Sequence, residues 1–273
     1  MQVLNQFYIK SVVRKALEED LKPKGDITTN IVSEKNKIIK ARIIAKQDGV
    51  IAGLEFCKTA FKLIGRETVF TKKVSDGKKI KKNKVIANIK AKTKTILTAE
   101  RTALNFLNHA SGIATITNQF VKKISKKTKI CCTRKTTPNL RTLEKYAVKK
   151  GGGHNHRYNL SDEILIKENH ISASNNLRDL VKKAIKTKKI VTVEIENTAY
   201  QARRPTMVAR SLDVVWMWQH DAVGVVDTAQ TQGVIPSKGW NRGMEIPWVL
   251  ETWQKNKDED DGAFQERGSF ESS

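Results

Sequence analysis

Cysteine, aromatic side chains and acidic side chains are scarce in this sequence of 273 residues. Its three cysteines, two of them adjacent at Cys131 and Cys132, are too few for the disulfide framework that stabilises small secreted domains. No apolar run approaches the roughly 18 residues that a membrane-spanning helix needs, and the N-terminus lacks the apolar core of a signal peptide. We therefore expect a cytoplasmic protein that is neither exported nor inserted in a membrane.

The scarcity of acid leaves a formal net charge of +23, from 51 basic and 28 acidic residues. Such an excess favours an anionic partner, for example a nucleic acid, a membrane surface or a phosphorylated small molecule. Lysines nevertheless make up 38 of the basic residues and are scattered, without an arginine-rich stripe or interleaved aromatics. We interpret most of them as a solvated surface and do not expect nucleic acid as the partner.

The composition changes near residue 198. Residues 199–273 contain 8 basic and 11 acidic residues and all five tryptophans, and the change follows a strand-like run with no linker. We predict a first domain at residues 1–110, the first part of a second domain at residues 111–198, and an atypical tail at residues 199–273. Our hypothesis is that the tail comes from a frameshifted or chimeric reading frame.

Hydrophobic periodicity predicts an α+β domain followed by alternating strands and helices. In the first part we expect a helix over residues 10–20, a strand at Ile38–Ala45, a helix at Leu54–Ile64 and a long helix from an N-cap at Thr98 to about residue 124. Later strands are predicted at residues 129–133, 163–167 and 190–196, with helices at residues 143–150 and Leu177–Lys186 between them. Repeated strand-helix units favour parallel strands, and hence a partial or complete α/β barrel whose functional loops gather at the carboxyl ends of the strands.

The first of three polar clusters, Thr133-Arg134-Lys135, follows the strand predicted at residues 129–133. A planar guanidinium beside an ammonium suits a carboxylate or a phosphate, because the first offers a fork of donors and the second a point charge. The alternative is a solvated turn in a lysine-rich protein. The cluster is therefore a candidate anion site.

The second cluster follows three consecutive glycines and contains His154, His156 and Arg157. Glycines let the backbone approach a ligand closely, and the side chains after them can donate hydrogen bonds to an anion. A zinc site is the competing interpretation. Because the two histidines have no cysteine or acid nearby in the sequence, we favour contacts to an anion.

The third cluster joins Lys167, at the end of an apolar strand, with Glu194 and Glu196 on one face of the next strand. If that face is buried, the carboxylates need cations or a metal; otherwise they form the wet face of an edge strand. Together with the first two clusters, these residues would surround a site for a multiply anionic substrate.

Five strings of the sequence resemble the quinolinate phosphoribosyltransferase family and occur in the family's order. They are GDITT at residues 25–29, TAERTALNFLNHASGIAT at 98–115, TRKTTPNLRTLEKYAVKKGGGHNHR at 133–157, LIKENHI at 165–171 and VTVEIEN at 191–197. The resemblance spans about residues 10 to 198, and strings of this length are specific. Two positions depart from the pattern: Cys132 stands where the family usually has Asp, and Asn139 where it usually has Gly.

The resemblance implies an open-faced α/β sandwich followed by an incomplete α/β barrel, in a homodimer whose active sites take residues from both subunits. The implied reaction transfers the phosphoribosyl group of phosphoribosyl pyrophosphate to quinolinate with decarboxylation, in the presence of Mg²⁺. Its product, nicotinate mononucleotide, enters NAD synthesis.

Matching positions imply the roles of individual residues. The residues implied to bind substrate are Arg101, from the neighbouring subunit, and Thr133, Arg134, Lys135, His156, Arg157, Lys167 and Glu194. Among them, Lys135, Lys167 and Glu194 would be catalytic. Lys167 and Glu194 would face the phosphoribosyl group, and Glu194 would lie near the Mg²⁺.

The tail generates a prediction about turnover. It shows neither the strand ending in Leu-Asp-Asn nor the Ser-Gly-Gly-Ile phosphate loop that the family places after this region, which makes an inactive pseudoenzyme or a lysine-rich nucleic-acid binder the alternatives. We expect slow or no turnover, because the backbone donors of the phosphate loop would be missing. A steady-state assay with quinolinate, phosphoribosyl pyrophosphate and Mg²⁺ checks this, and a turnover of about 1 s⁻¹ or more would contradict it.

Overall fold

A computed structural model of the chain describes residues 4–32, 36–125, 129–174, 176–194, 214–217, 223–225 and 248–253. In these residues the elements, in chain order, are α1 (Gln6–Leu21), α2 (Ile27–Val32), β1 (Ile38–Ala45), β2 (Gly49–Val50), α3 (Leu54–Ile64), β3 (Val69–Lys72), β4 (Lys79–Ile80), β5 (Val85–Lys92), α4 (Thr93–Lys123), β6 (Lys129–Cys132), α5 (Arg141–Lys150), β7 (His154–Asn155), β8 (Ile164–Ile166), α6 (Glu168–Ser174), α7 (Leu177–Lys186), β9 (Val191–Val193), β10 (Val214–Met217), β11 (Val223–Val225) and β12 (Trp248–Trp253).

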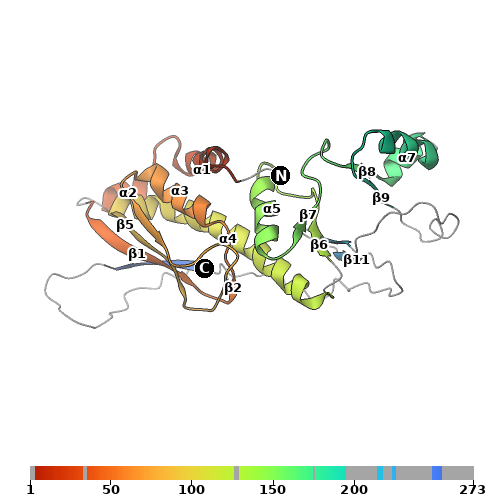
Figure 1. Cartoon of the computed structure of the whole chain (residues 1–273). Helices are drawn as coiled ribbons and strands as arrows, with labels where there is room; N and C mark the ends of the chain where they lie inside the picture. Colours follow the sequence, from red (N-terminus) through yellow and green to blue (C-terminus); the bar gives the residue numbers. More distant parts are fainter. Residues whose placement is uncertain are drawn as a thin grey trace.

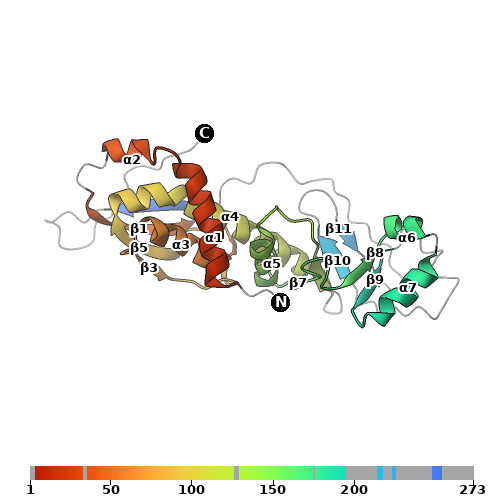
Figure 2. The same cartoon turned by 90° about the horizontal axis from the view of Figure 1, so that it is seen from above.

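The first domain is an antiparallel sheet of order β12-β1-β5-β3 with helices α1, α3 and α4 on one side (Figures 1 and 2). Along β1 the buried side chains of Ile39, Ala41 and Ile43 alternate with exposed Ile38 and Lys40. This alternation is typical of a sheet with one face packed on a core. The fold is mixed α/β, and its first domain has the sandwich architecture that the sequence predicted.

Helix α4 links the two domains. It has 31 residues and is therefore about 46 Å long. Its first half packs against α3 and the sheet, and its second half packs against α5 and β6 (Figure 1). The two domains thus share one continuous helix.

The predicted start of this helix is wrong. Helix α4 begins at Thr93, directly after β5, and Thr98 lies inside it with its hydroxyl donating to Asp26 Oδ2 at 2.9 Å. The N-cap residue, Lys92, makes no side-chain cap. Instead the Asn36 side chain accepts a hydrogen bond from the backbone N–H of Lys94 at 3.1 Å, so one of the orphan donors of the first turn is satisfied from outside the helix.

The second domain is built from parallel strand pairs. Strand β6 pairs in parallel with β7 and with β10, and β8 pairs in parallel with β9, while β11 runs antiparallel to β10. Helix α5 connects β6 to β7, and α7 precedes β9. These strand-helix-strand units agree with the predicted first part of an α/β barrel.

The tail is described only at three strands. Strand β10 pairs with β6, and β12 returns to the first domain, where it pairs antiparallel with β1 from Lys40↔Trp253 to Ala45↔Trp248. The predicted glutamate Glu196 and most of the tail, which the frameshift hypothesis concerns, lie outside the described ranges. The domain boundaries stay a prediction.

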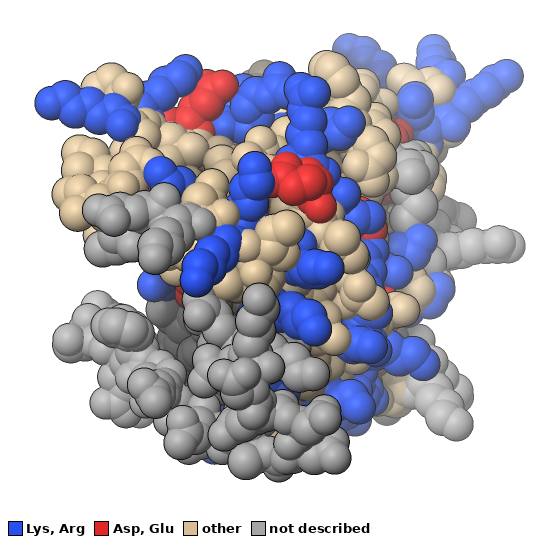
Figure 3. All heavy atoms as spheres, turned by 90° about the vertical axis from the view of Figure 1, so that its left-hand side faces the viewer, with Lys and Arg blue, Asp and Glu red and all other residues tan. Residues whose placement is uncertain are grey.

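The surface carries the basic excess of the sequence. Lysine and arginine cover much of the face shown in Figure 3, with few acidic side chains among them. All three cysteines are free thiols. Within the described ranges, none of the helices has the length and apolar character needed to cross a membrane.

Two glycines test the packing of α4. A Cβ on Gly151, at the end of α5, would lie 2.4 Å from Ala114 O and 2.6 Å from Thr117 Cβ, whereas a Cβ on Gly112 would meet nothing within 4 Å. We expect Gly151→Ala to lower the free energy of unfolding by about 1–3 kcal/mol through overpacking. The matched change Gly112→Ala should raise it by about 0.5–1 kcal/mol, since alanine is favoured inside a helix. Denaturant titrations measure both, and equal effects would contradict the close α4–α5 contact.

Candidate active site

The parallel pairing of β6 and β7 brings the first two polar clusters together. Cys131 pairs with His154 and Cys132 with Asn155, so both strands end at the same edge. Thr133 and Arg134 follow β6 directly, and His156 and Arg157 follow β7. The sequence prediction that these two clusters share one edge is thereby met.

The pairing of β8 and β9 brings the members of the third cluster together. Ile166 pairs with Val193, and the Glu194 N–H donates to Ile166 O at 2.8 Å. The next side chains, Lys167 and Glu194, form an ion pair with Nζ and Oε2 2.5 Å apart. The predicted lysine and glutamate are therefore direct neighbours.

Two interactions place the ends of the two strand pairs near each other. Desolvation, followed by the charge of Lys167, lowers the pKa of Lys135, while Glu194 acts in the opposite direction. On the β7 side, Arg157 Nη1 donates to Glu163 O at 3.3 Å, just before β8. The loop after β6 thus faces the ends of β8 and β9.

Burial and nearby cations both disfavour the charged form of Arg134. Desolvation, followed by the charges of Arg141 and Arg157, lowers the pKa of Arg134. Its Nε is buried and has no hydrogen-bond partner among the described residues. A buried unsatisfied donor costs about 1–3 kcal/mol, so this atom is placed to receive an acceptor from a ligand. An anion would satisfy the donor and relieve the repulsion together.

The side chain of His156 is neutral at pH 7. Burial, followed by the charges of Arg157 and Lys145, lowers its pKa to about 4. Its Nε2 lies 3.2 Å from Glu163 Oε2, a carboxyl whose pKa is raised by burial and by Asp162. Burial and the two cations outweigh the carboxylate, so the contact is a hydrogen bond from a neutral imidazole. His156 can donate a hydrogen bond here without adding a charge.

The loop after β6 is held by residues of α4 and α5 that were not predicted from the sequence. The buried Glu144 carboxylate accepts hydrogen bonds from the Thr137 N–H at 3.2 Å and lies 2.9 Å from His109 Nε2. Arg141 donates to Thr136 Oγ1 at 3.0 Å and to Tyr158 O at 3.2 Å.

Three further residues singled out in the sequence lie in the loop after β6 or on α4. The Thr133 hydroxyl accepts from the Lys135 N–H at 3.0 Å and so shapes the loop. Asn139 has φ 65°, the left-handed conformation that asparagine tolerates in place of glycine. Arg101 is exposed on α4, as the expected contribution to a neighbouring subunit requires.

The described residues do not form a metal cage. No group of three His, Cys, Asp or Glu side chains gathers in the described part of the chain. Neither the zinc interpretation of His154 and His156 nor a Mg²⁺ site made by protein ligands alone gains support. Glu194 offers one carboxylate, which is already paired with Lys167.

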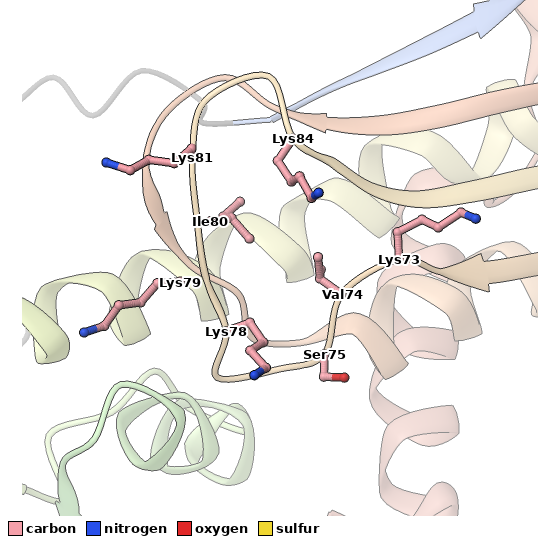
Figure 4. Close-up of a pocket in the computed structure, with 8 residues that line it drawn as sticks. All are labelled: Lys73, Val74, Ser75, Lys78, Lys79, Ile80, Lys81 and Lys84. Carbon is pink, nitrogen blue, oxygen red and sulfur yellow. The ribbon is translucent and has the colours of Figure 1, made fainter.

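A separate hollow lies in the first domain. Its lining consists of Lys73, Val74, Ser75, Lys78, Lys79, Ile80, Lys81 and Lys84 (Figure 4). The lysine side chains point in different directions around it, and Lys81 pairs with Asp48 at 2.6 Å. It contains none of the predicted site residues and lacks the convergent donors of an anion site, so we assign it no function.

Comparison with known proteins gives matches along most of the chain. The family model for the quinolinate phosphoribosyl transferase N-terminal domain matches residues 26–111, and the model for the C-terminal domain matches residues 113–233. The second match continues beyond Thr198, so the expectation that the tail lacks family resemblance is wrong as far as residue 233.

Individual relatives and solved structures indicate the same family. The chain is 34% identical to the carboxylating nicotinate-nucleotide pyrophosphorylase of Mycobacterium leprae, over 77% of each chain. The solved structure of the nicotinate-nucleotide pyrophosphorylase from Francisella tularensis is 38% identical with a TM-score of 0.69, covering 74% of this chain and 72% of that one. The corresponding protein from Ehrlichia chaffeensis is 36% identical with a TM-score of 0.67, covering 72% of each chain. With both domain models matched in order, the chain belongs to the quinolinate phosphoribosyltransferase family.

Proposed function

We propose that the site at the ends of β6, β7, β8 and β9 binds quinolinate and phosphoribosyl pyrophosphate and transfers the phosphoribosyl group with loss of carbon dioxide. The product is nicotinate mononucleotide, a precursor of NAD. Family membership supports this reaction and does not favour the alternative of a lysine-rich nucleic-acid binder.

One observation carries the assignment of quinolinate to this site. Among the described residues, the buried Nε of Arg134 has no hydrogen-bond partner, and burial followed by the charges of Arg141 and Arg157 lowers the pKa of this side chain. Quinolinate carries two adjacent carboxylates, which accept charge-assisted hydrogen bonds from guanidinium groups. Binding it here would satisfy the orphan donor and reduce the repulsion among the cations.

The other strand pair suits the second substrate. Lys135 and Lys167 are fixed cations for phosphate oxygens, and Glu194 holds Lys167 in place at 2.5 Å. Breaking the anomeric bond develops positive charge on the ribose, which the Glu194 carboxylate can stabilise. Lys135, Lys167 and Glu194 are therefore the proposed catalytic residues.

Mg²⁺ fits this site as a companion of the substrate. Mg²⁺ is commonly bound through one or two carboxylates together with substrate phosphates and water. Glu194 is the residue that would contact it, and the ion would neutralise charge on the departing pyrophosphate.

We also propose a homodimer formed through α2 and the exposed side of α4. Ile27 and Ile31 of α2 are 58% and 71% exposed, and Leu97 of α4 is 38% exposed. The contact from Thr98 to Asp26 holds α2 against α4 one turn before Arg101. Exposed apolar side chains beside Arg101 suit contact with a second copy, which would receive this arginine.

Replacing Arg134 tests the quinolinate site. We expect Arg134→Ala to raise the quinolinate dissociation constant about ten- to a hundredfold, because it removes charge-assisted hydrogen bonds of about 1.5–3 kcal/mol. Titration calorimetry on the full chain measures the change, with Arg66→Ala, an exposed arginine of the first domain, as the matched control. Unchanged affinity in Arg134→Ala would remove this residue from the site.

Replacing Ile31 tests the dimer. Sedimentation of the unaltered chain should give twice its mass of 30.8 kDa. Ile31→Glu should give the monomer, since it introduces a charge into the proposed contact, and should weaken quinolinate binding through loss of the partner's arginine. Ile185→Glu alters an isoleucine on α7 that is 62% exposed and should leave the dimer intact. A chain that sediments as a monomer before any change would refute the proposal.

A further inference from the structure

Helix α5 contains a buried lysine that has no role in the reaction proposed above. Lys145 is only 3% exposed, although it is a charged residue on a short helix. A lysine is buried at a cost unless its ammonium group is well partnered. The partners of Lys145 therefore indicate what the burial achieves.

Lys145 connects the two strands that carry the quinolinate cations. Its Nζ donates to Cys132 Sγ at 2.9 Å and to His156 O at 3.0 Å. Cys132 is the last residue of β6, and His156 is the first residue after β7. The lysine thus holds the chain at the two points from which the polar clusters depart.

The strand ladder alone does not extend to these clusters. Strands β6 and β7 pair only at Cys131↔His154 and Cys132↔Asn155, and Cys132 Sγ adds a contact to Asn155 Oδ1 at 3.3 Å. Beyond Asn155, the hydrogen bond from Lys145 to His156 O links the chain after β7 to the end of β6. His156 precedes Arg157 by one residue, so a shift of the His156 carbonyl would also shift the Arg157 guanidinium.

The charge of Lys145 also remains available to the site. Its hydrogen-bond acceptors among the described residues are a thiol sulfur and a carbonyl oxygen, while the neighbouring Glu144 is occupied by Thr137 and His109. A cation without a bound carboxylate adds to the attraction for an anionic ligand. Its field is felt at His156, where it is one of the causes of the lowered pKa.

We propose that Lys145 is a positioning residue that sets the spacing between Arg134 and Arg157 by tying the end of β6 to the backbone of His156. The inference rests on the proposed binding of quinolinate to these arginines. Lys145 does not touch the substrate. Cys132 serves as its anchor on β6, in the position where the family usually has an acid.

Binding measurements on three variants test this role. Lys145→Met keeps the length of the side chain and removes the ammonium, and we expect it to raise the quinolinate dissociation constant at least tenfold, with less than a threefold change for phosphoribosyl pyrophosphate. Cys132→Ser keeps an acceptor for Lys145 and should retain quinolinate affinity within threefold. Lys149→Met makes the same chemical change at an exposed position of α5 and should change neither affinity. Equal losses for both substrates in Lys145→Met would show a merely structural role and overturn the proposal.

A second readout does not depend on substrate. The groups whose charges bear on His156 are Arg157, Lys145 and Glu163. An NMR titration, with the His156 signal assigned through His156→Gln, should give a pKa of about 4 in the unaltered chain and a pKa raised by removal of a nearby cation in Lys145→Met. An unmoved pKa would show that Lys145 does not lie beside His156, even if Lys145→Met failed to fold well enough for calorimetry.

The two tests separate the possible failures. If the unaltered chain binds quinolinate and Lys145→Met binds it equally well, the positioning role is wrong and the proposed function stands. If the unaltered chain does not bind quinolinate, the proposed function fails and the role in substrate positioning fails with it, whatever the NMR titration shows.

Discussion

Burial of cationic side chains close to one another, at the ends of β6 and β7, is the constraint on which the site depends. Arg134 is partly withdrawn from water, and the charges of Arg141 and Arg157 lower its pKa. Like charges this close separate unless the backbone holds them or an anion lies between them. The parallel pairing of the strands supplies the first condition, and a dicarboxylate substrate would supply the second. This arrangement supports the proposal that the site binds a multiply anionic ligand.

The first domain helps to hold the loop that carries Arg134. The Tyr8 hydroxyl of α1 donates to Asn139 O at 3.0 Å, at the far end of that loop. From α4, His109 contacts Glu144, which in turn accepts from the loop backbone. Tyr146 of α5 donates to Asp76 Oδ2 at 2.7 Å, in the first domain. The sandwich domain therefore supports the site directly, beyond supplying a hydrophobic core.

Local patterns predicted those parts of the fold that local sequence determines. The strand at Ile38–Ala45 and the helices at Leu54–Ile64 and Leu177–Lys186 have the predicted bounds, because alternation and helical spacing are read from neighbouring residues. The start of α4 was missed because its first turn is capped by Asn36, which lies far away in the sequence. A contact of that kind leaves no periodic signal.

In the candidate site, too, some residues could be predicted from the sequence and others could not. Arg134, Arg157, Lys167 and Glu194 were predicted because polar residues follow apolar strands, and parallel strands end at a common edge. Lys145 and Glu144 were missed, since they lie within an amphipathic helix where charge is ordinarily solvated. Their burial becomes visible only when α5 is packed against α4 and β6. The sequence thus indicated the polar groups at the ends of the strands and missed the buried groups that hold their loop; that the former bind substrate stays a prediction.

A crystal structure of this chain with quinolinate would locate the ligand. We expect both carboxylates at the carboxyl ends of β6 and β7, with one of them accepting a hydrogen bond from the buried Nε of Arg134 and the other facing Arg157. Quinolinate bound elsewhere, for example among the lysines of the first-domain hollow, with Arg134 still unpartnered, would contradict the assignment of this site.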